Sequence, residues 1–218
     1  MSAPKRVGVL ISGRGSNMLS LIEACNKPGY PAEIAHVISN VKNAPGLERA
    51  ADAGVATTTI DHKAYETRGA FERDLDAALR DAGVDLVCNA GFMRLLTEGF
   101  VEAWRDRQLN IHPSLLPAFK GLHTHERAIE AGVRLSGCTV HFVRTEMDSG
   151  PIVAQAAVPV LPEDTPGELA ARVLEAEHKL YPLALKLVAS GEAEVENERV
   201  VFRSCPTVQG PYISPWIT

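Results

Sequence analysis

Short apolar runs alternate with helix-like segments through the first half of the sequence. The run Val7–Ile11 has no polar alternation, which is typical of a strand buried on both faces of a parallel sheet. Comparable runs predict strands at residues 34–38, 56–60, 86–90 and 109–111. Helical spacing appears between them, as in Met18, Leu21, Ile22 and Cys25. The alternation predicts an α/β fold with a doubly wound, mostly parallel twisted sheet and right-handed crossovers.

The pattern changes after residue 132. Residues 138–143 and 152–160 are strand-like, and Asp148-Ser149-Gly150 lies between them with the chemistry of a turn. We therefore expect an antiparallel C-terminal hairpin, which makes the sheet mixed. From Ser190 onward the sequence predicts only short strand-like pieces and loop.

A long helix is predicted after the second strand of this hairpin, and its two ends have the strongest capping signals in the sequence. Thr165 and Glu168 have the spacing of a capping box, and Gly191 lies just beyond the expected end. Glu177 falls on the apolar line of this helix, where a carboxylate is unfavourable unless it meets a partner or a ligand. Pro182 should kink the helix, because it frees a backbone carbonyl.

Composition limits the kinds of partner. At 218 residues, with 45% hydrophobic residues and a formal charge of −5, the chain is expected to form a single domain, 1–218, that binds small molecules. The acidic balance argues against a nucleic acid or an anionic membrane as partner. No apolar stretch approaches the roughly 20 residues of a membrane span, and the first run is too short for a signal peptide. Scattered cysteines indicate reduced thiols in a cytoplasmic protein: Cys25, Cys88, Cys138 and Cys205.

A glycine-rich loop, Ser12-Gly13-Arg14-Gly15-Ser16-Asn17, follows the first strand and opens the first helix. Backbone N–H groups and the helix N-terminus at such a loop favour a phosphate. Met18 replaces the third glycine of the dinucleotide fingerprint, and the Lys-Ser/Thr pair of a P-loop is missing. A tight turn with a helix cap remains the alternative interpretation.

The most informative segment for chemistry is Leu109 to Pro117. Asn110 and His112 are two residues apart, so they project from one face of a strand. An amide donor and an imidazole, joined by the isolated carboxylate of Asp148, would suit a developing oxyanion in acyl-type transfer. The alternative is a polar strand end and a turn aspartate. His123 and His125 have the spacing of metal ligands, but no third ligand stands beside them, and we expect no metal.

At this point the sequence resembles a known family, the folate-dependent phosphoribosylglycinamide formyltransferases, over nearly its whole length. The resemblance rests on six stretches: residues 11–17, 46–50, 90–94, 109–117, 137–143 and 177–178. It implies a Rossmann-like formyltransferase fold. It also implies transfer of a formyl group from 10-formyltetrahydrofolate, as co-substrate, to the amine of N1-(5-phospho-D-ribosyl)glycinamide in purine biosynthesis, without a metal.

The resemblance also implies a set of site residues in two halves, 1–105 for the phosphate and 106–218 for catalysis and folate. The catalytic residues would be Asn110, His112 and Asp148. The ribonucleotide would be held by Gly15, Ser16, Asn17, Glu177 and Arg107. Folate would be held by Arg68, Met93, Arg94, Leu95, Leu96, Asn110, Arg144, Thr145, Glu146, Met147 and Asp148.

Three other functions remain possible from the sequence. A 10-formyltetrahydrofolate hydrolase or a formyltransferase for another amine, such as a charged tRNA, would use the same chemistry. A non-catalytic nucleotide-binding module would use only the glycine loop. We expect a monomer or a homodimer.

Overall fold

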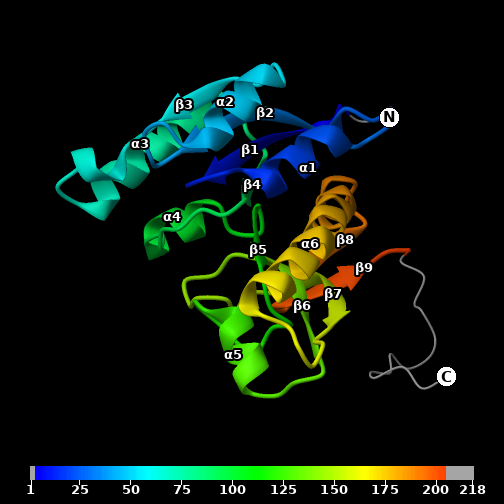
Figure 1. Ribbon diagram of the computed structural model, residues 1–218. Helices are drawn as coiled ribbons and strands as arrows, with labels where there is room; N and C mark the ends of the chain where they lie inside the picture. The colour runs from blue at the N-terminus through cyan, green and yellow to red at the C-terminus, as the bar shows by residue number, and fades with distance from the viewer. Residues whose placement is uncertain (1–2, 205–218) are drawn as a thin grey trace.

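A seven-stranded sheet forms the centre of the fold in a computed structural model that describes residues 3–204 (Figure 1). Its spatial order is β3-β2-β1-β4-β5-β6-β7. The strands are β1 (Lys5–Ile11), β2 (Ala32–Ser39), β3 (Thr57–Thr59), β4 (Leu86–Asn89), β5 (Gln108–His112), β6 (Leu135–Phe142) and β7 (Ile152–Pro159). Strands β1 to β5 pair in parallel, whereas β6 and β7 are antiparallel. The predicted doubly wound sheet with an antiparallel hairpin is confirmed.

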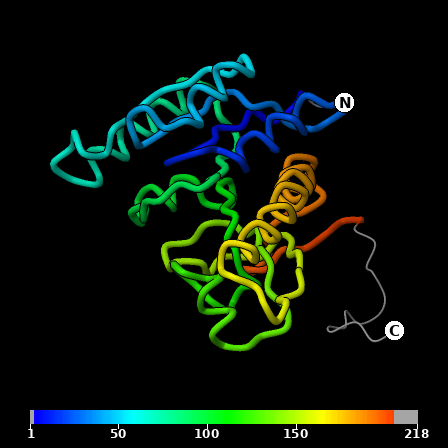
Figure 2. The backbone as a smooth tube through the Cα atoms, in the orientation of Figure 1, coloured from blue at the N-terminus to red at the C-terminus, as the bar shows by residue number. Residues whose placement is uncertain are grey.

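Helices cover both faces of this sheet. They are α1 (Ser16–Cys25), α2 (Pro45–Asp52), the 3₁₀ turn η1 (His62–Ala64), α3 (Arg68–Asp81), α4 (Glu98–Ala103), α5 (Thr124–Glu130) and α6 (Pro166–Ala189). α1 and α6 lie side by side on one face, and α3 and α4 lie on the other side of the sheet (Figures 1 and 2). A second sheet pairs β8 (Ala193–Glu196) with β9 (Arg199–Phe202).

The two-sided burial of β1 explains its unbroken apolar run. Val9 and Ile11 pack into the core beneath α1 and α6, whereas Leu10 packs into the core beneath α3. Gly8 allows α3 to approach closely, because a Cβ atom there would lie 2.5 Å from Cδ2 of Leu79. The strand and the glycine together fix where the loop after β1 emerges.

β5 is the junction between the parallel and antiparallel parts of the sheet. Asn110 is in register with Asn89 of parallel β4 and with His141 of antiparallel β6. After β6 the chain turns back over the sheet, and the N–H of Phe142 donates to the carbonyl of Pro151 at 2.9 Å. Polar groups from three strands and one returning loop therefore meet on one face.

α6 begins with the predicted capping box, in which Thr165 and Glu168 exchange side-chain-to-backbone hydrogen bonds. Pro182 does not interrupt the helix, and its carbonyl accepts a hydrogen bond from the Tyr30 hydroxyl at 2.7 Å. β3 is shorter than the predicted 56–60 strand, because only three of its residues pair with β2. Within residues 3–204, no helix has both the length and the apolar character needed to cross a membrane.

Three cysteines lie within the described residues, and all are free thiols. Burial raises the pKa of Cys25, Cys88 and Cys138 to about 12, so these thiols hold their protons at neutral pH. This agrees with the expected reduced thiols, and Cys88 and Cys138 are buried whereas Cys25 is half-buried. Cys205 lies outside the described residues.

Candidate active site

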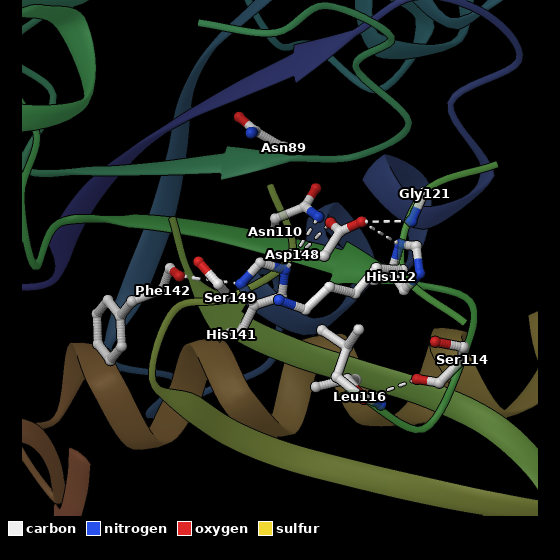
Figure 3. Close-up of polar contacts among 12 residues, drawn as sticks. Asn89, Asn110, His112, Ser114, Leu116, Gly121, His141, Phe142, Asp148 and Ser149 are labelled. Carbon is white, nitrogen blue, oxygen red and sulfur yellow. Dashed lines mark hydrogen bonds and ion pairs between the residues drawn. The ribbon is translucent and has the colours of Figure 1, made fainter. Parts of the chain in front are cut away.

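The centre of the candidate site is a cross-strand pair, Asn110 on β5 and His141 on β6 (Figure 3). His141 Nδ1 lies 2.9 Å from the carbonyl of Phe142 and donates to it. Burial lowers the pKa of His141, so the ring is neutral and its Nε2 is an acceptor. That Nε2 accepts from Asn110 Nδ2 at 3.2 Å. The pair fixes the orientation of the Asn110 amide, and its second N–H meets no other acceptor within residues 3–204, so it can donate to a ligand.

His112 and Asp148 lie beside this pair. His112 Nδ1 is 3.5 Å from Asp148 Oδ2, and both side chains are almost completely buried. His112 Nε2 donates to the carbonyl of Phe119 at 3.0 Å. Both ring nitrogens thus face acceptors, and only the imidazolium form supplies a proton to each. The N–H of Gly121 donates to Asp148 Oδ2 at 2.9 Å and holds the carboxylate in place.

The loop that supplies the Phe119 carbonyl is held by a buried hydroxyl. Thr139 Oγ1 donates to the carbonyl of Ser114 at 2.7 Å and accepts from the N–H of Leu116 at 3.0 Å. Gln155 Nε2 donates to the carbonyl of Leu116 at 2.9 Å. The antiparallel strands β6 and β7 therefore set the path of the loop that faces His112.

The glycine loop forms the second part of the site. Gly15 caps α1 in the left-handed region, with φ 71, so the first N–H groups of the helix face the loop. Ser16 is the first helical residue. Asn17 Nδ2 donates to Glu177 Oε2 at 2.7 Å. Burial raises the pKa of Glu177. The sequence predicts a partner or ligand for this carboxylate, and the structure shows that Asn17 is a partner.

Two exposed apolar segments border the site. Met93 and Leu95 are 70% and 60% exposed, and Met147 is 48% exposed. The first segment is linked to the glycine loop, because the N–H of Met93 donates to Ser12 Oγ at 2.8 Å. Ser12 Oγ in turn donates to Asn40 Oδ1 at 2.6 Å. Arg94, Thr145 and Glu146 are exposed, and Leu96 is half-buried.

Two predicted binding residues, Arg107 and Arg68, make no hydrogen bond or ion pair with these groups among residues 3–204. Arg107 precedes β5, about 16 Å along the strand from His112. Its guanidinium lies over the Trp104 ring and donates to the carbonyl of Ala103, so the side chain is engaged with the end of α4. Arg68 begins α3 and is exposed.

Sequence reasoning missed the contribution of His141, Thr139 and Gln155. The sequence does contain a signal for two of them: Thr139 and His141 are two residues apart in a strand, so their side chains lie on the same face. Their partners depend on the antiparallel register of β5, β6 and β7. Among residues 3–204, no group of three metal-ligating side chains lies together, and His123 is the left-handed residue before α5.

Comparison with known proteins agrees with the fold. The model of the formyl transferase family matches residues 5–185. A crystal structure of glycinamide ribonucleotide transformylase 1 from Symbiobacterium toebii superposes with a TM-score of 0.90 at 48% identity, covering 93% of this chain and 95% of that one. The fold is that of a formyl transferase.

Similar proteins of known name identify the family more closely. The chain is 44% identical over 189 residues to phosphoribosylglycinamide formyltransferase from Escherichia coli, covering 87% of this chain and 89% of that protein. It belongs to the phosphoribosylglycinamide formyltransferase family. It is also 50% identical over 198 residues to the trifunctional purine biosynthetic protein adenosine-3 of Homo sapiens, of whose length it spans 20%.

Proposed function

We propose that the protein transfers the formyl group of 10-formyltetrahydrofolate to the amine of N1-(5-phospho-D-ribosyl)glycinamide in purine biosynthesis. The observation that carries the proposal is the meeting of Asn110, His112 and Asp148 on one face of the sheet, with His112 and Asp148 3.5 Å apart. The family membership supports the same reaction.

The proposed reaction is direct attack. The amine nitrogen forms a bond to the formyl carbon, and the carbonyl oxygen becomes an oxyanion. The second N–H of the Asn110 amide would stabilise this oxygen by about 3–4 kcal/mol, and the positive charge of protonated His112 would stabilise it further. The bond from carbon to the folate N10 then breaks. The proton lost by the amine ends on N10, and Asp148 would pass it through a water molecule.

The ribonucleotide would bind across the glycine loop. Its phosphate would accept from the N–H groups of Gly15, Ser16 and Asn17 at the start of α1, where the helix dipole favours an anion. Glu177 would accept from hydroxyl or amine protons of the ligand. Arg107 is left out of this proposal, because its side chain is engaged with α4.

Folate would lie between the two exposed segments. Residues 93–96 and the backbone of residues 144–148 would line the pterin pocket, and Arg68 would meet the benzoyl-glutamate end. The division into a phosphate half and a catalytic half, a cytoplasmic location and a monomer or homodimer belong to the same proposal.

The direct test follows the absorbance of 10-formyltetrahydrofolate with purified protein, with and without the ribonucleotide. Turnover that requires the ribonucleotide is expected, and the His112→Ala variant is the matched control that should remove it. Turnover without the ribonucleotide would indicate a hydrolase. Absence of turnover in both mixtures would contradict the proposal. The remaining functions would then be a non-catalytic nucleotide-binding module or a formyltransferase that acts on another amine.

A further inference from the structure

Glu198 occupies an unusual position in the turn between β8 and β9. Glu196 pairs with Arg199, so the turn consists of Asn197 and Glu198 alone, with φ values of 49 and 58. Left-handed geometry at both positions favours Asn-Gly, because a side chain at the second position costs roughly 1–2 kcal/mol. Glutamate in place of glycine therefore needs a compensating interaction of its side chain.

That interaction is with arginines outside the hairpin. Arg144 Nε donates to Glu198 Oε2 at 2.7 Å, and Arg105 Nη2 donates to Glu198 Oε1 at 2.5 Å. Arg144 Nη2 also donates to Asp106 Oδ1 at 2.6 Å. The Arg144 side chain is only 9% exposed, so its charge is held between two carboxylates. Loss of one carboxylate leaves a buried charge partly uncompensated.

Arg144 is also the first residue of the segment that ends at Asp148. The far end of this segment is fixed by the Gly121 N–H, which donates to Asp148 Oδ2 at 2.9 Å. Residues 145–147 between the two ends are exposed. The turn lies next to this region, because residues 149–152 and 198–200 line one open cleft. The segment therefore has two anchors, and the ion pairs of Arg144 are the first.

We propose that Glu198 is a positioning residue for folate. The turn between β8 and β9 holds Arg144 and thereby sets the path of the backbone of residues 144–148. This inference rests on the proposed function, in which that backbone lines the pterin pocket. It assigns a role to the C-terminal hairpin, which lies beyond residues 5–185 matched by the family model.

The test is the Glu198→Gly variant, because glycine suits the turn and removes only the carboxylate. We expect the KM for 10-formyltetrahydrofolate to rise about tenfold, while kcat and the KM for the ribonucleotide change less than about twofold. The melting temperature should change little, because relief of the left-handed strain at residue 198 offsets the loss of the ion pairs with Arg144 and Arg105. A role limited to hairpin stability predicts the reverse: a lower melting temperature and an unchanged folate KM.

Two further variants complete the design. Glu194→Gln removes an ion pair of the same hairpin, with Arg203 at 2.8 Å, and should leave both KM values unchanged. Asp106→Asn removes the other negative charge beside Arg144, and asparagine tolerates the left-handed backbone at this position. This variant should also raise the KM for folate. An unchanged folate KM in Glu198→Gly would overturn the inference.

Hydrogen exchange separates this inference from the proposed function. If the wild-type protein has no transferase activity, the function fails, but the anchor can still be tested. Amides of residues 144–148 should then exchange faster in Glu198→Gly than in wild type and in Glu194→Gln. Equal exchange in the three proteins would refute the anchor.

Discussion

The side-chain amide of Asn17 donates to the carboxylate of Glu177 at 2.7 Å, which joins the first turn of α1 to the middle of α6. The contact buries a carboxylate with one direct donor, and burial raises the pKa of Glu177. The Oδ1 atom of Asn17 is buried beside it without a hydrogen-bond partner among the described residues. These two side chains therefore present acceptors that a ligand with hydroxyl or amine protons can satisfy.

We predict that Glu177→Gln stabilises the fold and weakens ribonucleotide use. The folded pKa of Glu177 lies above its ordinary value of 4.5, so its contribution to stability falls as the pH rises through the raised pKa. The variant should melt at a higher temperature than wild type at pH 8, and the difference should vanish below the ordinary value. Its kcat/KM for the ribonucleotide should fall at least about tenfold. A lower melting temperature at pH 8 would contradict the prediction.

His112→Ala and Asp148→Asn should each lower kcat by about 10²–10⁴-fold, because both remove groups that stabilise or move charge in the transition state. Circular dichroism should show an unchanged fold. Near-normal turnover in either variant would remove that residue from the catalytic assignment.

His141 orients the Asn110 amide by accepting its hydrogen bond at 3.2 Å. His141→Leu removes this acceptor, and we expect kcat to fall about tenfold with smaller changes in both KM values, as for one lost hydrogen bond. His141→Gln restores an acceptor oxygen and should recover part of the loss. Equal rates in the two variants would mean that the acceptor does not matter.

Asp164 should protect the protein against acid. Its carboxylate accepts two hydrogen bonds from Arg172, at 2.7 and 2.8 Å, and this pair lowers the pKa of Asp164 to about 2. Stability from the pair is complete above the ordinary value of 3.8 and is lost as the pH falls through about 2. Asp164→Asn should reduce the free energy of unfolding by about 1 kcal/mol at pH 7. Denaturant titrations at pH 7 and pH 2 check this, since the difference should be much smaller at the lower pH.

A buried pair of side-chain amides on β4 and β5 gives a further prediction. Gln108 Nε2 donates to Asn89 Oδ1 at 3.0 Å, and Gln108 Oε1 is buried without a described partner. Asn89→Leu leaves the Gln108 amide unpaired and should destabilise the protein by about 1–3 kcal/mol. Adding Gln108→Leu should recover most of this loss. A double-mutant cycle from urea titrations measures the coupling, and additive losses would disprove it.

Much of the sheet could be predicted because its signals are local. The unbroken run of β1 indicates burial on both faces, and the spacing of Asn110 and His112 places both on one face of β5. The unfavourable position of Glu177 on an apolar helix line indicated a partner, and the structure supplies Asn17.

Groups that depend on the pairing of distant strands were not predictable in this way. His141 lies in a buried apolar strand, and its contact with Asn110 follows only from the antiparallel register of β5 and β6. Arg144 is expected to line the pterin pocket through its backbone, but the contacts of its side chain with Asp106 and Glu198 were not predicted. That contact depends on a turn more than 50 residues away, for which no local pattern exists.

The exposed rim of Met93, Leu95 and Met147 determines how binding should respond to temperature. A flat heteroaromatic ligand lying between the two segments would remove this apolar surface from water, and such burial gives a negative heat-capacity change. The enthalpy of association would then become more favourable on warming, while the entropic contribution declines. The same three side chains that stand in solvent in the free protein would thus set the calorimetric signature of folate capture.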